Sequence, residues 1–250
     1  MKVTILGCGT SGGVPKMPLH WGDCDPANPK NRRRRASILI EQGETCLLVD
    51  TSPDLREQML SAGVMDLSAV FYTHDHADHT HGIDDLRGFA QATREKVHIY
   101  ADEATLQILK ERFGYIFHTV NGYPAIARGH SIKGNVKVGS ITMQPFEQIH
   151  GDSLTLGYRF GDIAYSTDLN AMPESAFETL KGVKIWIVDA LRHQPHPTHT
   201  HLSQTLEWIE RVKPERAILT HMTWDLDYET LKKALPKGVE PAYDGMIIEL

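Results

Sequence analysis

The segment His74–His79 (HDHADH) places three imidazoles and two carboxylates within six residues. It directly follows the apolar run Ala69–Tyr72, which is typical of a buried strand. Divalent metals bind where neutral imidazole nitrogens and ionised carboxylate oxygens converge on one point. In an extended chain His74 and His76 point to the same side, and the turn that follows can bring Asp78 and His79 toward a second centre. The segment therefore predicts a metal site rather than an ordinary polar loop.

Three further residues repeat this local arrangement, because His150, Asp168 and His221 each stand at the end of an apolar run. Taken alone, each is as consistent with a hydrogen-bonded loop residue as with a metal ligand. Two metals need about six or seven protein ligands, and the three residues complete that number. The predicted ligands are His74, His76, Asp78, His79, His150, Asp168 and His221.

The elements that must position these ligands are predicted from apolar periodicity and from glycine and proline positions. Met1–Leu6 is expected to be a strand that enters the glycine-rich loop Gly7–Gly13. Val136–Phe146 and Leu154–Phe160 are expected to be antiparallel strands. Antiparallel strands come early in each half of the chain and helices follow, which predicts an α/β (α+β) fold: a four-layer αββα sandwich of two mixed β-sheets flanked by helices. The whole chain, residues 1–250, is predicted to form one domain with the ligands at one edge of the sandwich.

Composition limits the classes of partner. The 250 residues carry a formal net charge of −6, so no global basic field attracts nucleic acid, and no stable nucleic-acid complex is expected. No apolar stretch reaches the roughly 18 residues that span a bilayer, so no membrane partner is expected. The three cysteines, Cys8, Cys24 and Cys46, are odd in number and widely spaced, and the chain has no secretory signal peptide, which together favour a reducing cytoplasm. Homodimer formation is left open.

The order and spacing of the ligands resemble the metallo-β-lactamase superfamily over almost the whole chain. An aspartate at position 168 fits the dinuclear hydrolase branches, whereas a cysteine there would fit the β-lactamases. The resemblance implies the metallo-β-lactamase fold and distributes the ligands between two metals. It assigns His74, His76 and His150 to the first metal, Asp78, His79 and His221 to the second, and Asp168 to both.

Within the superfamily the chain is most similar to the phosphodiesterases of the carbon–phosphorus lyase pathway, which act on a phosphoribosyl cyclic phosphate. The shared segments are Gly7–Pro15, Thr73–His79 with His81-Gly82 after it, Leu219–His221 and Tyr243–Met246. The resemblance implies hydrolysis of small cyclic or nucleotide-like phosphodiesters. Alternatives are a tRNA-processing endonuclease, for which the chain lacks an obvious basic arm, and a thioester or lactone hydrolase. An alternative of another class is a metal-binding protein without turnover in cofactor biosynthesis.

The N-terminal excursion departs from that phosphodiesterase family, which holds a structural zinc there with clustered cysteines and a histidine. Here the excursion has only Cys24, and Trp224 occupies the histidine position. A structural zinc needs four good ligands, so the predicted cofactors are two divalent ions, Zn²⁺ or Mn²⁺, and no structural zinc. Trp21 and Trp224 are expected to fill the vacated space, and most of Arg32–Arg35 is expected to be a solvated loop.

The chemistry implied by two metals is attack on phosphorus by a hydroxide that bridges them. The leaving alkoxide needs a proton, and an imidazole suits that task. His199 stands where the related phosphodiesterases place their acid, and His201 is the better match to other branches. Both stay open as the catalytic acid, and Asp78 is expected to be a catalytic residue as well as a ligand.

Three residues are predicted to assist from outside the ligand set. Asp50, at the end of an apolar run, is expected to hold a metal-binding imidazole in one tautomer. Tyr243 and Asp244, in a loop near the C-terminus, are expected to contact the substrate.

Overall fold

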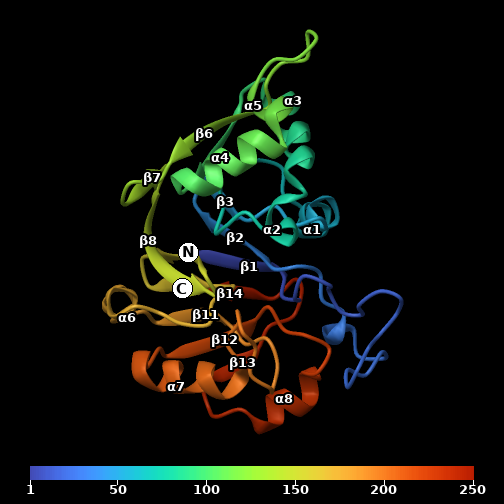
Figure 1. Cartoon of the computed structure of the whole chain (residues 1–250), viewed down its shortest axis with the longest axis vertical. Helices are drawn as coiled ribbons and strands as arrows, with labels where there is room; N and C mark the ends of the chain where they lie inside the picture. The colour runs from blue at the N-terminus through green and yellow to red at the C-terminus, as the bar shows by residue number, and fades with distance from the viewer.

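The computed structural model describes residues 1–250, in which two seven-stranded sheets pack face to face between helices (Figure 1). The first sheet has the order β14-β1-β2-β3-β4-β5-β6. Strands β1 to β3 and β14 pair antiparallel, and β3 to β6 pair parallel. Its strands are β1 (Lys2–Gly7), β2 (Ser37–Gln42), β3 (Thr45–Val49), β4 (Ala69–Phe71), β5 (Val97–Ala101), β6 (Ala127–Ser131) and β14 (Ile247–Glu249).

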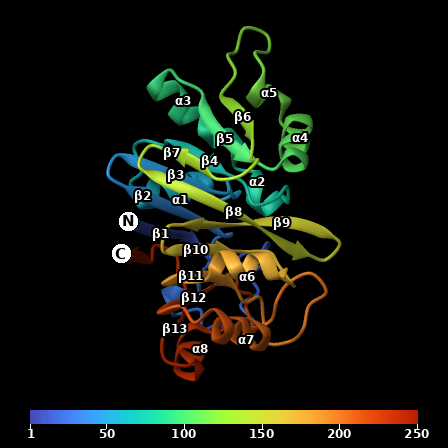
Figure 2. The same cartoon turned by 90° about the vertical axis from the view of Figure 1, so that its left-hand side faces the viewer.

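The second sheet repeats this mixture with the order β13-β12-β11-β10-β9-β8-β7. Strands β7 to β10 pair antiparallel, and β10 to β13 pair parallel. Figure 2 shows the two chain ends side by side, where β14 pairs with β1. The strands are β7 (Val136–Val138), β8 (Ile141–His150), β9 (Ser153–Phe160), β10 (Ile163–Ser166), β11 (Ile185–Asp189), β12 (Arg216–Thr220) and β13 (Val239–Pro241).

Helices form the outer layers, and each half of the chain supplies its own set (Figure 1). None of the helices has both the length and the apolar character needed to cross a bilayer. The first half contributes α1 (Leu55–Ala62), α2 (Ala77–Thr80), the 3-10 helix η2 (Ile83–Leu86), α3 (Arg87–Thr93), α4 (Glu103–Arg112) and α5 (Gly114–Phe117). The second half contributes α6 (Glu174–Leu180), α7 (Leu202–Val212) and α8 (Tyr228–Ala234).

The period-two alternation of strand side chains builds two separate cores. In β2, Ile38 and Ile40 point between the sheets into a cluster of 35 buried residues. Leu39 points the other way, into a cluster of 18 buried residues between the first sheet and its helices. The fully buried Trp186 of β11 belongs to the larger cluster. This arrangement confirms the expected αββα sandwich of two mixed sheets.

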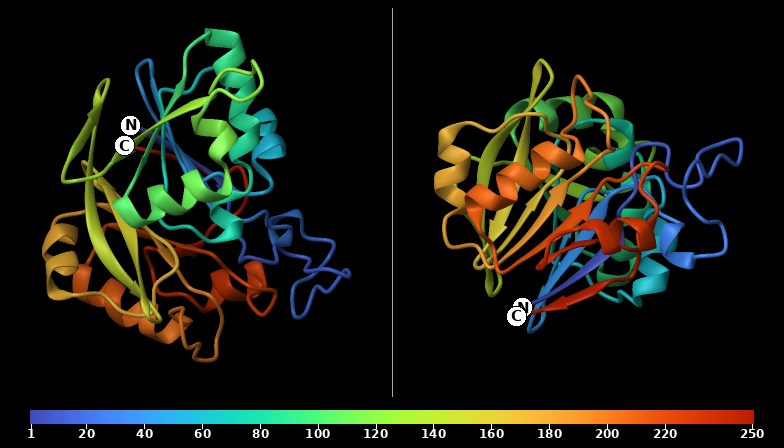
Figure 3. Two further views of the ribbon diagram at one scale, coloured as in Figure 1. Left: turned by 45° about the horizontal axis from the view of Figure 1, so that its top comes forward. Right: turned by 90° about the horizontal axis from the view of Figure 1, so that it is seen from below.

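The N-terminal excursion, residues 15–35, lies beside α8 and includes the short 3-10 helix η1 (Pro29–Asn31) (Figure 3). The expectation that most of Arg32–Arg35 is a solvated loop was wrong, because only Arg32 is exposed. Arg34 and Arg35 are partly buried and form ion pairs with Asp244 and Asp54. The side chain of Arg33 is buried, with 2% of the residue exposed. Its guanidinium donates to the backbone carbonyls of Thr223 at 2.8 Å and Leu226 at 2.6 Å. A buried guanidinium needs acceptors for its N–H groups, and these two carbonyls come close to Arg33 only in the folded chain. Their hydrogen bonds therefore hold the excursion against the segment that contains Thr223 and Leu226.

Trp224 packs into the same region as predicted. The space beside Gly22 is filled by its indole, which would lie 2.3 Å from a Cβ at that glycine. His20 meets Trp224 edge-on at 5.3 Å between ring centroids, and the Lys16 ammonium lies 4.7 Å from the indole centroid. Trp21 lies instead beneath the Arg32 guanidinium, 5.4 Å from it.

Candidate metal centre

The predicted ligands meet at one edge of the sandwich because they follow strands that end there. The segment after β4 carries the histidine cluster, and its last residues form the first turn of α2. His150 ends β8, Asp168 lies two residues beyond β10, and His221 directly follows β12. Strands β8, β10 and β12 run in the same direction, so their carboxyl ends share one edge.

The structure brings the seven predicted ligands into two groups, within each of which the ligand atoms lie within 4.8 Å of one another. Asp168 belongs to both groups. Its Oδ1 lies 3.9 Å from His74 Nε2, and its Oδ2 lies 3.0 Å from His79 Nε2 and 3.4 Å from His221 Nε2. One carboxylate therefore presents one oxygen to each group. The first group is His74, His76, His150 and Asp168, and the second is Asp78, His79, Asp168 and His221.

Three of the ligand nitrogens fit a metal because no hydrogen bond within the protein satisfies them. The Nε2 atoms of His74, His79 and His221 are buried and accept or donate no hydrogen bond. A buried polar atom without a partner costs about 1–3 kcal/mol, and three in one place are a large burden for a folded protein. Imidazole nitrogens and carboxylate oxygens are the ligands that Zn²⁺ and Mn²⁺ accept, so a divalent ion in each group would satisfy them.

Burial and charge give the imidazoles different protonation behaviour. Burial, together with the neighbouring His79, holds the pKa of His74 well below its usual range, so this ring is neutral and ready to bind a metal. Burial alone would lower the pKa of His221, but the Asp168 and Asp189 carboxylates raise it to about 9. In the absence of metal, His221 therefore holds a proton that a metal must displace.

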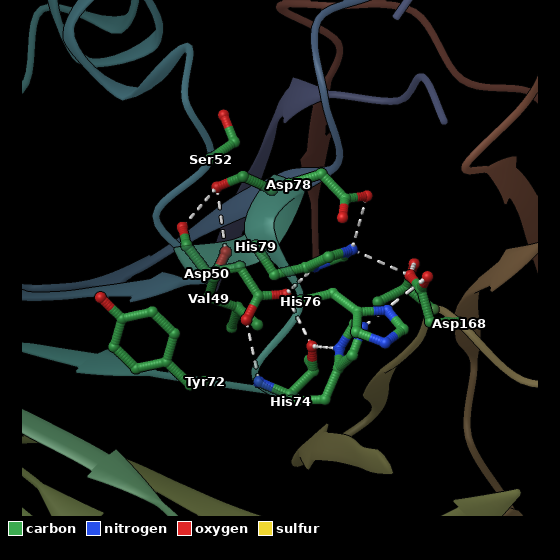
Figure 4. Close-up of polar contacts among 12 residues, drawn as sticks. Val49, Asp50, Ser52, Tyr72, His74, His76, Asp78, His79 and Asp168 are labelled. Atoms are coloured by element: carbon green, nitrogen blue, oxygen red, sulfur yellow. Dashed lines mark hydrogen bonds and ion pairs between the residues drawn. The ribbon is translucent and has the colours of Figure 1, made fainter. Parts of the chain in front are cut away.

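Two protein groups hold the rings of two predicted ligand histidines, and Figure 4 shows the first of them, Asp50. Asp50, fully buried at the end of β3, accepts a hydrogen bond of 2.7 Å from His79 Nδ1 through Oδ2. The same carboxylate accepts from the Thr73 backbone N–H and hydroxyl, both at 2.8 Å. On the other side, His150 Nδ1 donates to the Thr198 carbonyl at 2.6 Å. Both contacts leave Nε2 as the atom that could bind a metal.

Asp189 is a site residue that the sequence reasoning missed. It lies at the end of β11 and is fully buried. Its Oδ2 accepts a hydrogen bond of 3.0 Å from His199 Nδ1 and one of 3.1 Å from the Asp168 backbone N–H. The signal was present, because Asp189 follows the apolar run of β11 in the way that Asp50 and Asp168 follow theirs.

The two candidate acids differ in their surroundings. His199 Nε2 lies 3.7 Å from Asp168 Oδ1, and its ring stacks on His221 at 4.9 Å and meets His150 edge-on at 4.6 Å. His201 is the residue that precedes α7, and it makes no ion pair or ring contact with the seven ligands. The structure therefore brings His199, and not His201, beside both ligand groups.

Asp244 and Tyr243 lie next to the N-terminal segments. The Asp244 carboxylate accepts from the Arg34 backbone N–H at 2.7 Å and from the Cys8 backbone N–H at 3.2 Å, which ties the C-terminal loop to the glycine-rich loop. The Tyr243 ring lies 4.5 Å from the Lys30 ammonium and meets the Tyr228 ring at 5.9 Å. Their contact with substrate stays a prediction.

The chain is similar to known proteins in both sequence and fold. Residues 45–222 match the Beta-lactamase superfamily domain. A solved structure described as a new diphosphatase from the PhnP family is 37% identical, with a TM-score of 0.93 over 100% of this chain and 97% of that one. Zn²⁺-bound PqqB from Methylobacterium extorquens, 17% identical, has a TM-score of 0.79 over the full length of both chains, which is a likeness of fold.

A curated relative, the octanoyltransferase of Porphyromonas gingivalis, is 32% identical over 255 residues. The match covers 98% of this chain and 51% of that protein. The chain thus spans about half the length of this relative.

Proposed function

Because this chain belongs to the metallo-β-lactamase superfamily, we propose that it is a metal-dependent hydrolase that cleaves small phosphodiesters with two divalent ions. The observation that carries the proposal is the Asp168 carboxylate, which presents one oxygen to each ligand group. His199 lies beside that carboxylate, where a leaving group can be protonated. Two bound ions would supply an activated water and positive charge for the phosphoryl oxygens.

The residues around His199 support a role in proton transfer. Asp189 accepts the Nδ1 hydrogen bond and so fixes the ring with Nε2 toward Asp168. Because Asp189 also accepts from the Asp168 backbone N–H, one carboxylate positions both the acid and the shared ligand. His199 Nε2 would then hold the proton that the leaving oxygen takes as its bond to phosphorus breaks.

A second candidate is hydrolysis of a diphosphate, favoured by the 37% identity to the PhnP-family diphosphatase. The attack on phosphorus would be the same, but the leaving group would be a phosphate, which is a far weaker base than an alkoxide. A diphosphate should therefore depend less on the proton from His199. The effect of a single variant, His199→Ala, therefore distinguishes diester hydrolysis from diphosphate hydrolysis.

The test is a substrate panel on protein loaded with Zn²⁺ or Mn²⁺. It should contain cyclic nucleotides, ribose cyclic phosphates, linear diesters, dinucleoside diphosphates, phosphomonoesters and an octanoyl thioester. We expect a diester or a diphosphate to be cleaved fastest, and His199→Ala to slow an alkyl diester more than a diphosphate. Fastest turnover of a monoester or of the thioester would overturn the proposal. His193→Ala, an exposed histidine of the same loop, is the matched control.

A further inference from the structure

His196 lies in the 190–201 loop, between β11 and α7, and the proposed hydrolysis gives it no role. Its ring centroid lies 5.2 Å from that of His199, with an angle of 59° between the ring planes. His199 in turn contacts the rings of His150 at 4.6 Å and His221 at 4.9 Å. His196 is therefore one ring farther from the ligand groups than the proposed acid. At this position it can meet the leaving group, because the metals would hold the phosphoryl oxygens.

Backbone hydrogen bonds close the 190–201 loop at its base. The Leu191 N–H donates to the Thr200 carbonyl at 3.2 Å, and the Leu202 N–H donates to the Arg192 carbonyl at 2.9 Å. The Arg192 guanidinium donates to two carbonyls inside the loop, at 3.1 and 2.7 Å. These bonds restrict the loop before any substrate binds, which lowers the cost of ordering its side chains around a ligand.

Asn170 joins the 190–201 loop to the turn that follows the ligand His150. Its side-chain NH₂ donates to the Pro197 carbonyl at 3.0 Å, and its side-chain oxygen accepts from the Gly151 N–H at 2.8 Å. The Thr198 methyl group packs on the same turn, where it would lie 2.8 Å from a Cβ at Gly151. Hydrogen bonds and packing together therefore hold the loop against the metal centre.

Thr198 sets the orientation of the His196 ring. Its backbone N–H donates to His196 Nδ1 at 3.3 Å, and its hydroxyl lies 3.3 Å from the same nitrogen. Burial, together with the neighbouring His199 and Arg192, lowers the pKa of His196 below its usual range, so the ring is neutral. A neutral imidazole has one N–H group, and because Nδ1 is an acceptor, the proton is on Nε2. Both hydrogen bonds of the ring use Nδ1, so Nε2–H is a free donor beside His199.

We propose that His196 is a substrate-binding residue that donates a hydrogen bond from Nε2 to a second oxygen of the leaving group. That oxygen would be close to the one that His199 protonates. The inference rests on the proposed hydrolysis, because the position of the leaving group is taken from His199. No bond to His196 forms or breaks, and its proton stays on the ring while His199 gives up its own.

The consequence is a preference among leaving groups. A group that carries a second oxygen near the scissile bond would be favoured over a plain alkyl or aryl group. His196 is partly exposed, so water can satisfy Nε2–H when the substrate lacks that oxygen, and the preference should be modest. A hydrogen bond of this kind contributes about 3–10-fold.

The experiment compares methyl 2-methoxyphenyl phosphate with methyl phenyl phosphate on the metal-loaded full chain. The two phenols differ by one methoxy oxygen beside the scissile bond and leave with nearly the same basicity, so both make the same demand on His199. We expect kcat/KM of the wild type to be about 3–10-fold higher for the methoxy compound. His196→Ala should lose this ratio while its rate on the phenyl compound, per bound metal, stays unchanged. His196→Gln, which keeps an N–H donor, should retain part of the ratio.

The control is His193→Ala, at an exposed histidine of the same loop, and it should keep the wild-type ratio. A purely structural role for His196 would slow both compounds alike, because Thr198 also holds the ligand His150 through its carbonyl. Equal slowing of both compounds by His196→Ala, an unchanged ratio in that variant, or a wild type without the preference would overturn the inference.

A binding measurement separates this inference from the proposed function. If the wild type cleaves neither diester, phosphodiester hydrolysis is in doubt, and the same two compounds are then titrated as ligands by calorimetry. Tighter binding of the methoxy compound that His196→Ala abolishes would support the role of His196 in the absence of turnover. Equal affinity for the two compounds, or binding of neither, would overturn it.

Discussion

Replacement of Asp50 by asparagine would test how the protein holds its metal-binding histidines. The Asp50 carboxylate accepts three hydrogen bonds, one from His79 Nδ1 at 2.7 Å and two from Thr73 at 2.8 Å. Thr73 Oγ1 in turn lies 3.0 Å from His74 Nδ1. Asp50 therefore supports the second ligand group directly and the first group through one intermediate residue.

The magnitude follows from the number of acceptors. An asparagine side chain has one oxygen, so in Asp50→Asn its NH₂ group would face either the Thr73 N–H or the His79 N–H. One buried donor would then lack an acceptor, which costs about 1–3 kcal/mol. That range corresponds to about 5–150-fold in affinity, in agreement with the 10–100-fold that loss of such a supporting group typically causes. We expect the metal of the second group to be lost first, because His79 is the ligand that Asp50 contacts.

The assay is titration of the metal-loaded protein with a chelator, with metal release followed in two steps. Asp23→Asn, at an exposed carboxylate of the excursion, is the control variant. Circular dichroism of both variants without metal would show whether they fold. Unchanged affinity for both metals in a folded Asp50→Asn protein would refute the reasoning that this carboxylate orients His79.

Three further predictions follow from the same geometry. His199→Ala should slow hydrolysis of an alkyl or ribose diester by about 10²–10⁴-fold, the usual contribution of general acid catalysis. It should slow hydrolysis of a p-nitrophenyl ester much less, because nitrophenolate leaves without a proton. Equal slowing of both substrates in a variant with full metal content would exclude His199 as the acid. Burial opposes the proton on His221, but the Asp168 and Asp189 carboxylates raise the pKa of that imidazole to about 9. The Asp168, Asp78 and Asp50 carboxylates also hold the pKa of His79 well above its usual range, against the effect of burial. Metal affinity should therefore fall as pH falls below about 9, because the metal must displace these protons. Calorimetry in buffers of different ionisation enthalpy would detect the released proton, and a pH-independent affinity would contradict the prediction. Arg112→Ala removes a 2.7 Å ion pair to Asp75, which stands between two predicted ligands of the first metal. Because the Arg112 side chain is 44% exposed, the free energy of unfolding should change by less than about 1 kcal/mol. Affinity for the first metal should fall by up to about tenfold, and Arg112→Lys should give an intermediate affinity.

The layers of the fold and the meeting of the ligands could be predicted because both depend on local pattern. A polar residue after an apolar run lies at the end of a strand, and the ends of parallel strands share one edge. Asp189 satisfies the same pattern as Asp168. Asp168 belongs to the ligand groups, whereas Asp189 supports them. This difference depends on side-chain geometry in the folded site, and it could not be predicted from the sequence pattern.

Other features depend on contacts between distant segments. The expected single strand Val136–Phe146 is a hairpin of β7 and β8, because Gly139 turns the chain with a φ of +53°. A Cβ at Gly139 would lie 2.1 Å from Thr45 Oγ1 on the first sheet, so the turn follows from packing between sheets. Arg33 is buried because its acceptors, about 190 residues later, come to it in the fold. Neither contact can be predicted from the local periodicity of the sequence.

The most direct test of the two-metal centre is the metal content of gently purified protein and of Asp168→Ala, measured by elemental analysis. The geometry predicts two divalent ions per chain, because each ligand group receives one oxygen of Asp168. Asp168→Ala should lose one or both ions and nearly all activity. Three ions per chain would contradict the prediction that the excursion around Cys24 holds no structural zinc. A folded Asp168→Ala protein that keeps two ions and full activity would contradict the central claim that this carboxylate serves both metals.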